Sequence, residues 1–244
     1  RMDMQENWHT YWKNPGDSGG PIKVKWSHDD NIAISDLYWP TPILIPYEPL
    51  MTYGYKNFVI FPYEINNYND QNSFIEANID FLICDDICVP EKALIKTNLN
   101  EIKNDAELYD WFLKVPSQIL PVRASLDSEF INIRFSWPFD VSSATFFIDN
   151  QEIIEHASDQ KLIKEENIYL LKIKKLDDLK SFEYLSGVLT INDNESYIID
   201  TEIENTTENS LNISFLQALI FAFVGGLILN LMPCVFPIIS LKVL

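Results

Sequence analysis

Apolar and polar residues alternate with a period of two over much of the chain. Between residues 75 and 83, apolar side chains take every second position: Ile75, Ala77, Ile79, Phe81 and Ile83. This alternation is typical of a half-buried β-strand, and residues 93–99 can form the strand that returns beside it. Other strand-like runs occupy residues 58–65, 130–135, 144–148, 168–173, 188–191 and 197–203. The pattern predicts a mainly β protein.

One short segment has the helical period instead. Within residues 105–115 the apolar side chains fall at helical spacing: Leu108, Trp111, Phe112 and Val115. Pro116 then ends the run, because proline cannot continue a helix, and we place a domain boundary at residues 116–121. Strands at such intervals, with turn residues between them, are typical of β-sandwiches. The sequence therefore predicts two immunoglobulin-like β-sandwich modules, residues 1–117 and 118–206.

The C-terminal segment is apolar throughout. Residues 215–231 include no charged side chain, and only Gln217 and Asn230 are strongly polar. A helix of that length rises about 25 Å, so it approaches the thickness of a bilayer core. We predict that residues 211–244 form a transmembrane helix. The acidic residues before it and Lys242 after it favour an N-terminal bulk outside the cytoplasm.

The composition of the chain excludes some classes of function. Of the 244 residues, 47% are hydrophobic, which is enough for cores in one large or two small domains. The formal net charge is -18 at pH 7. This acidity argues against nucleic-acid binding, because phosphate contacts need clustered Lys and Arg side chains that the sequence lacks.

Two cysteines lie at the tip of the predicted hairpin. Cys84 and Cys88 follow its first strand and precede the second. Side chains on neighbouring strands lie about 4.5–5.5 Å apart, close enough for a disulfide. Closing such a short loop stabilises a fold by only roughly 2 kcal/mol, so a reversible redox pair is favoured over a structural bridge.

Cys234 is the third cysteine, and it lies in the apolar C-terminal segment between Pro233 and Pro237. Prolines interrupt helical hydrogen bonds. Irregular backbone at membrane depth is tolerated only where protein or a water-filled cavity covers it, so the pattern suggests a functional position. The alternative is an inert apolar cysteine beside a proline kink.

Two other chemistries compete with the redox interpretation. Residues 16–21 spell Gly-Asp-Ser-Gly-Gly-Pro, the nucleophile string of chymotrypsin-like proteases, but outside this string only His9 and Asp3 precede Ser18 as His or Asp residues. Because that family places its His and Asp well upstream of the Ser, a glycine-rich turn is the preferred interpretation. Structural zinc usually takes about four ligands, whereas the three histidines are scattered along the chain. Zinc and copper binding are therefore the weaker alternatives.

Together these segments resemble the DsbD family of membrane thiol:disulfide interchange proteins, and within it the branch that includes ScsB. The resemblance covers nearly the whole chain, although the two cysteines are closer in sequence than in the best-known member. The last segment is similar to the first transmembrane helix of the family's electron-conducting domain. The resembling residues are 8–19 with 39–42, 52–55, Cys84 and Cys88 with 89–91, 146–147 with His156, 185–189, and 230–237.

The resemblance implies roles for individual residues. Cys84 and Cys88 would be the active cysteines, and Cys234 would belong to a membrane cysteine pair. No cofactor or metal is implied beyond these redox-active cysteines. The aromatic cap loop that shields the redox pair would be Tyr53, Gly54 and Tyr55.

The implied activity is that of a protein-disulfide reductase in the bacterial inner membrane, with its N-terminal bulk in the periplasm. Electrons would pass from cytoplasmic thioredoxin, through the chain's own membrane domain, to periplasmic thioredoxin-like partners, in cytochrome c maturation or copper tolerance. Because Leu244 precedes the family's later helices and C-terminal domain, we expect this segment alone to be incomplete. The alternatives are a membrane-anchored β-sandwich binding module with a structural disulfide, and a copper-binding module.

Overall fold

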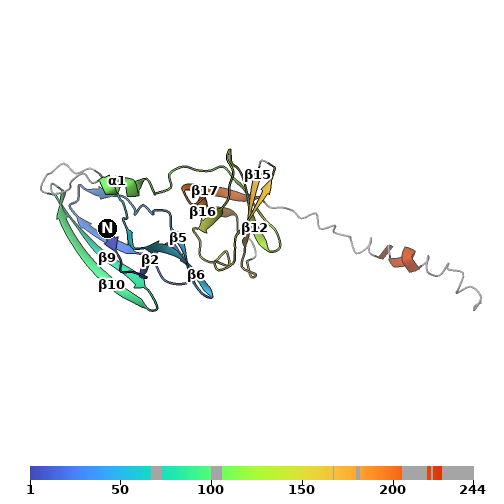
Figure 1. Cartoon of the computed structure of the whole chain (residues 1–244), viewed down its shortest axis with the longest axis horizontal. Coiled ribbons are helices and arrows are strands. Elements are labelled where there is room, and N and C mark those ends of the chain that lie inside the picture. The colour runs from blue at the N-terminus through green and yellow to red at the C-terminus, as the bar shows by residue number, and fades with distance from the viewer. Residues whose placement is uncertain are drawn as a thin grey trace, which may run out of the picture. The chain divides into compact units, whose positions relative to one another are not determined.

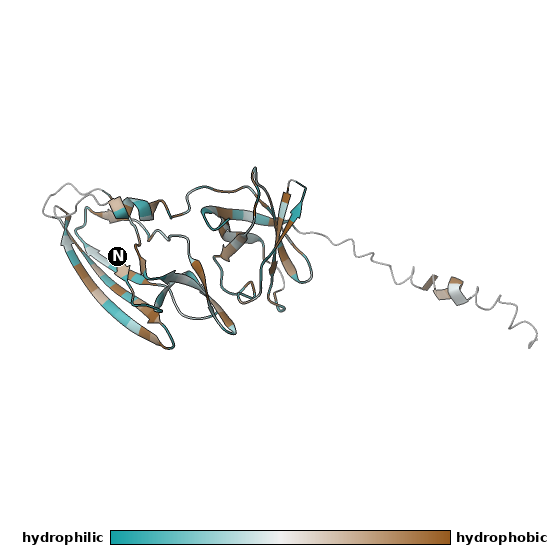
Figure 2. Cartoon of the chain, in the orientation of Figure 1, coloured by the Kyte–Doolittle hydropathy of each residue, from teal (hydrophilic) through white to brown (hydrophobic). Residues whose placement is uncertain are grey.

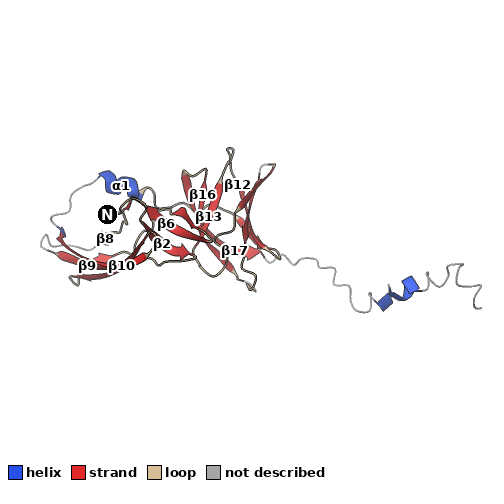
Figure 3. Cartoon of the chain, turned by 60° about the horizontal axis from the view of Figure 1, so that its bottom comes forward, coloured by secondary structure: helices blue, strands red, loops and turns tan. Residues whose placement is uncertain are grey.

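The chain divides into two compact units, Arg1–Thr206 and Thr207–Leu244. Strands dominate the first unit (Figures 1 and 3) and form two larger sheets that follow each other in sequence. The prediction of a mainly β protein with sandwich-like sheets is confirmed. We keep the names first module and second module for residues 1–117 and 118–206; their boundary and immunoglobulin-like kind stay predictions. The computed structural model describes residues 1–66, 73–99, 106–166, 168–179, 182–204, 219–220 and 222–226.

The first module is built on a six-stranded sheet in the order β10-β9-β2-β6-β5, with β3 also paired to β9. All of these pairs are antiparallel. Two small antiparallel sheets pair β1 (Met2–Asp3) with β7 (Phe58–Val59) and β4 (Ala33–Ile34) with β8 (Ile65–Asn66). The strands of the main sheet are β2 (His9–Gly16), β3 (Lys23–His28), β5 (Ile43–Tyr47), β6 (Leu50–Lys56), β9 (Phe74–Cys84) and β10 (Cys88–Asn98).

Strands β9 and β10 form the long hairpin that the alternating pattern predicts. They pair along their full length, and Figure 2 shows both apolar and polar residues along the two strands. Opposite charges face each other across the hairpin, where Asp80 lies 2.8 Å from Lys92 and Glu76 lies 2.5 Å from Lys96. Such cross-strand pairs favour one register. The register in turn fixes the position of the hairpin tip.

The prediction of one continuous strand at residues 58–65 is wrong. Only the two ends of this segment are extended, as Phe58–Val59 and Ile65–Asn66, and they belong to different small sheets. Pro62 lies between them and has no N–H group to donate to a sheet. Its carbonyl accepts a hydrogen bond from the Tyr38 N–H at 3.0 Å instead. The proline therefore splits an otherwise apolar, strand-like run.

The predicted short helix is present. Helix α1 spans Ala106–Phe112, and Pro116 follows shortly after its end. Its buried residue is Trp111, whose ring packs against the ring of Phe58 with centroids 5.3 Å apart. The Lys114 ammonium lies 3.9 Å from the centroid of the Trp111 ring. These contacts attach the helix to the first module before the chain enters the second.

The second module is one seven-stranded sheet in the order β13-β16-β17-β11-β12-β15-β14. Its pairs are antiparallel except that of β11 with β17. Fully buried side chains such as Ile131, Leu171 and Leu189 form its core, and each contributes about 1.5–3 kcal/mol by leaving water. The strands are β11 (Arg123–Leu126), β12 (Phe130–Ser136), β13 (Ala144–Ile148), β14 (Lys161–Glu165), β15 (Ile168–Lys174), β16 (Tyr184–Ile191) and β17 (Glu195–Glu204).

The second compact unit contains the predicted transmembrane segment, residues 211–244. Residues 219–220 and 222–226 are helical. Among the residues that the structure describes, no helix is long and apolar enough to cross a membrane. The rest of the predicted span, including Cys234, lies outside the described residues. The transmembrane helix and the role of Cys234 stay predictions.

Candidate redox site

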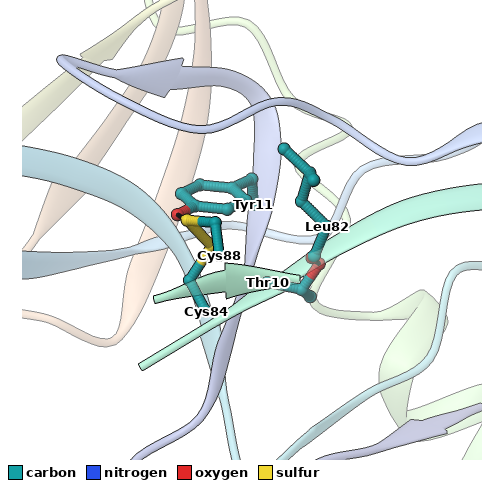
Figure 4. The surroundings of a disulfide bond; sticks show 5 residues. All are labelled: Thr10, Tyr11, Leu82, Cys84 and Cys88. Carbon is teal, nitrogen blue, oxygen red and sulfur yellow. Dashed lines mark hydrogen bonds between the residues drawn. A yellow bond between two sulfur atoms is a disulfide. The ribbon is translucent and has the colours of Figure 1, made fainter. Parts of the chain in front are cut away.

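The tip of the β9–β10 hairpin holds a disulfide bond. Cys84 ends β9 and Cys88 begins β10, and the two residues face each other in the antiparallel register. Their Cα atoms are 4.1 Å apart and their sulfurs are bonded (Figure 4). The prediction that the hairpin brings the two sulfurs within bonding distance is confirmed.

The two cysteine residues differ in their exposure to solvent. Cys84 is only 1% exposed, whereas Cys88 is an exposed residue. Ile87, next to Cys88 in the turn, is 68% exposed. A thiol-disulfide exchange needs a sulfur that the partner can reach. Cys88 is the member of the pair that meets this requirement.

Strand β2 lies beside the hairpin tip and supplies its neighbours. His9 faces Cys84 in the strand register, and the Thr10 hydroxyl donates a hydrogen bond to the Leu82 carbonyl at 2.9 Å. The Tyr11 hydroxyl lies 3.4 Å from the Cys88 sulfur (Figure 4). Because a disulfide sulfur carries no hydrogen, the Tyr11 hydroxyl is the donor in this contact.

Burial favours the neutral forms of the His9 and Tyr11 side chains on this strand. It raises the pKa of Tyr11, and a hydrogen bond with the Ser18 side chain opposes part of that rise. Burial also lowers the pKa of His9; the Lys56 charge acts in the same direction, and the Asp85 charge opposes it. The His9 and Tyr11 rings pack edge to face with centroids 5.2 Å apart. The sulfur of Cys88 therefore has a neutral hydroxyl donor beside it.

The protease-like string forms a turn behind Tyr11. Gly16 and Gly19 have φ values of +80° and +92°, the left-handed region that favours glycine. The Asp17 backbone N–H donates to the Met51 carbonyl at 3.0 Å, and the Asp17 carboxylate accepts from the Met51 N–H at 2.8 Å. A Cβ added to Gly19 would overlap the ring of Tyr11. The glycine-rich turn is confirmed, and Gly19 allows close packing against Tyr11.

The described contacts do not assemble a protease triad around Ser18. The His28 ring bonds to the Asp29 backbone carbonyl. His156 contacts the Tyr53 hydroxyl and the Gln151 carbonyl. Within the described residues, no group of three or more His, Cys, Asp or Glu side chains could hold a metal ion.

The predicted cap residues Tyr53, Gly54 and Tyr55 lie on β6. Tyr53 is fully buried and its hydroxyl is 2.9 Å from His156 Nδ1, while the Tyr55 hydroxyl donates to a backbone carbonyl at 2.7 Å. Gly54 pairs with Tyr11 across the strands, and a Cβ there would overlap the β2 backbone. The structure thus gives both tyrosine hydroxyls other partners than the sulfurs. Their shielding role stays a prediction.

Tyr11 is the aromatic residue that contacts the redox pair, and the sequence analysis did not single it out. The only sequence feature that could have indicated it is its position in the aromatic segment of residues 8–12. The contact itself joins residues 77 positions apart. It therefore depends on the placement of β2 beside β9, which the local pattern does not specify.

Comparison with known proteins gives two matches. Residues 1–100 match the family model described as "Thiol:disulfide interchange protein DsbD, N-terminal". The fold is similar to the crystal structure of the N-terminal periplasmic domain of ScsB from Proteus mirabilis, with a TM-score of 0.66 and 19% sequence identity. This likeness covers 82% of this chain and 84% of that one. A search of curated proteins found no match.

Proposed function

We propose, from the match of residues 1–100 to the family model of DsbD N-terminal domains, that the chain exchanges disulfides with protein partners through Cys84 and Cys88. The observation that carries the proposal is the asymmetry of the pair. Cys84 is a buried residue, whereas Cys88 is an exposed residue whose sulfur lies beside a hydroxyl donor. This arrangement suits a pair that opens and closes, because a purely structural bridge needs no accessible sulfur.

The exchange proceeds in two displacement steps. In the reduced protein, the Cys88 thiolate attacks one sulfur of a partner's disulfide, which forms a Cys88–partner mixed disulfide and releases the other partner sulfur as a thiolate. The Cys84 thiolate then attacks the Cys88 sulfur, closes the Cys84–Cys88 disulfide and releases the second partner thiolate. Both released thiolates take up protons from water. Two electrons pass from the cysteine pair to the partner.

Tyr11 assists the attacking group. When the pair is reduced, its hydroxyl can donate to a thiolate at Cys88, and a hydrogen bond to a charged acceptor is stronger than one to a neutral acceptor. Such a bond lowers the pKa of a thiol. The neighbouring carboxylates of Asp85 and Asp86 oppose this effect, because negative charge disfavours a thiolate. Tyr11 therefore offsets the acidic turn.

The turn also has a surface that suits a partner protein. Ile87 is exposed beside Cys88 and lies between Asp86 and the exposed sulfur in the sequence. An apolar side chain flanked by acidic groups fits a partner whose active-site surface is apolar with a basic rim. Thioredoxin-like proteins of the periplasm are the partners that the family resemblance suggests.

The resemblance supplies the wider setting of this proposal. The chain would lie in the bacterial inner membrane with both modules in the periplasm. Its own membrane domain, through Cys234 and a second membrane cysteine, would pass electrons from cytoplasmic thioredoxin to the Cys84–Cys88 pair. Tyr53, Gly54 and Tyr55 would limit the access of oxidants to that pair. Cytochrome c maturation and copper tolerance are the processes it would serve.

The test traps the mixed disulfide. The full chain with Cys84→Ala is reduced and mixed with an oxidised thioredoxin-like protein that carries a Cys-x-x-Cys disulfide. Because no resolving thiol remains, we expect an adduct at Cys88, separated on a non-reducing gel and mapped by peptide mass spectrometry. The mapping also distinguishes adducts at Cys234. In the matched control Cys88→Ala, the remaining Cys84 is buried and should give at least about tenfold less adduct. A tenfold lower rate corresponds to an activation free energy about 1.4 kcal/mol higher.

Two results would contradict the proposal. The absence of any adduct at Cys88 would show that the exposed sulfur does not exchange with such partners. Equal adduct from both single-cysteine variants would show that the difference in burial does not decide the order of attack.

A further inference from the structure

We propose that the second module positions the redox site, and that Gln151 and Asn14 are the positioning residues that connect it to Tyr11. The proposal rests on the proposed function, since it concerns the reactivity of the same cysteine pair. It gives the second module a role that needs no redox chemistry of its own.

Contacts between the modules concentrate on the end of β2, just after Tyr11. The Asn14 side-chain amide donates to the Ile148 carbonyl at 2.7 Å, and this bond is buried. The Gln151 side-chain amide donates to the Gly16 carbonyl at 2.5 Å. Ile148 ends β13 and Gln151 follows shortly after it. One corner of the second module therefore holds the segment of β2 that leads into the glycine-rich turn.

An ion pair and ring contacts strengthen the same interface. The Lys13 ammonium lies 2.7 Å from the Asp149 carboxylate. The Phe147 ring packs edge to face against Trp12 and Tyr53, with centroids 6.2 Å and 5.1 Å away. Aromatic pairs of this kind contribute stabilisation beyond that of the apolar area that they bury. The interface is consequently specific in both its polar and its apolar contacts.

The sheet alone does not fix this segment. The register between β2 and β6 shifts between Tyr11 and Gly16, as at a bulge, where regular ladder pairing is interrupted. The Asn14 side-chain oxygen accepts a hydrogen bond from the Gly16 N–H at 2.9 Å. The Asn14 side chain thus forms one hydrogen bond within the irregular segment, to Gly16, and one to the second module, at Ile148.

The turn then transmits this constraint to Tyr11. Gly19 leaves no room between its backbone and the Tyr11 ring. Tyr11 is 1% exposed, and its hydroxyl contacts the Cys88 sulfur at 3.4 Å. A hydrogen bond depends steeply on geometry. A shift of the turn would therefore weaken the donor that faces Cys88.

The experiment measures the reactivity of Cys88 rather than stability. The full chain is reduced, and the rate of Cys88 alkylation by iodoacetamide is followed from pH 6 to 10 by peptide mass spectrometry, which yields the apparent pKa of the thiol. Tyr11→Phe removes the donor and should lower the alkylation rate at pH 7 by about threefold to tenfold, as expected for one hydrogen bond. Gln151→Ala should shift the pH profile in the same direction.

Two further variants separate positioning from general damage. Gln160→Ala is the matched control, because the Gln160 side chain bonds backbone groups within the second module, at Phe146, rather than the Gly16 carbonyl in the turn; its pH profile should not change. Gln151→Glu keeps the side-chain size and loses the donor, so it should behave like Gln151→Ala. In the double variant with Tyr11→Phe, loss of Gln151 should add nothing, because both substitutions remove the same interaction.

The outcomes distinguish this inference from the proposed function. If Tyr11→Phe shifts the profile and Gln151→Ala does not, or if the two effects add, the positioning role is overturned. If Tyr11→Phe itself has no effect, the route through Tyr11 is overturned. Neither result bears on the trapping of a mixed disulfide at Cys88, which tests the exchange reaction separately.

Discussion

Replacing Gly19 by alanine should destabilise the first module, because a Cβ at this position would overlap the ring of Tyr11. The φ of Gly19 is +92°, and a left-handed backbone costs an L residue about 1–2 kcal/mol. An extra methyl group forced into a packed site costs about 1–3 kcal/mol more. We therefore expect Gly19→Ala to lower the free energy of unfolding by about 2–5 kcal/mol.

The neighbouring glycine provides the matched control. A Cβ on Gly20 would meet its nearest atom, Cδ1 of Leu82, at 3.5 Å, which is an ordinary contact. Gly20→Ala should therefore change the free energy of unfolding by less than about 0.5 kcal/mol. Urea denaturation of the oxidised full chain, followed by tryptophan fluorescence, measures both values. If Gly19→Ala proves as stable as Gly20→Ala, the Tyr11 ring is not packed against the turn, and the reasoning fails.

Two more predictions concern buried polar groups. Burial lowers the pKa of His9 in the folded chain, so the unfolded chain binds this proton first and stability falls as the pH drops below about 6.5. His9→Gln should then lose less stability than the unsubstituted chain between pH 7.5 and 5.5 in urea denaturation, and an equal loss would contradict this. Asn14→Ala should lower the free energy of unfolding by about 2–4 kcal/mol, because it leaves the Ile148 carbonyl and the Gly16 N–H without their partner. Asn150→Ala, which removes one exposed turn bond, is its control, and equal losses would count against the buried network.

The local sequence pattern was sufficient to predict the β9–β10 hairpin, where buried and exposed positions alternate along part of β9. The β9–β10 hairpin follows from the alternation at residues 75–83, and it brings Cys84 and Cys88 together because they are adjacent to its turn. The predicted strands of the second module at β12, β13, β15, β16 and β17 are also present. Two described strands of the second module were not predicted. Of these, β11 has only four residues, and β14 is an edge strand whose residues are mostly exposed.

Contacts between distant segments could not be predicted in this way. Tyr11 reaches Cys88 only because β2 lies beside β9, and Asn14 reaches Ile148 across 134 positions of sequence. Neither contact leaves a periodic signal, since each depends on how completed sheets and modules pack. For Tyr53, the segment was identified from the sequence but its partner was not. Its aromatic segment was noticed, but its hydroxyl contacts His156 in the second module rather than the sulfurs.

The midpoint potential of the Cys84–Cys88 pair tests the central claim most directly. The full chain is equilibrated in dithiothreitol or glutathione buffers of defined potential, free thiols are alkylated, and the oxidised fraction is measured by mass spectrometry. The account predicts a potential between about -270 and -120 mV, the range of proteins that exchange disulfides. A potential below about -300 mV would show that the bond resists reduction like a structural disulfide, and it would contradict the exchange function.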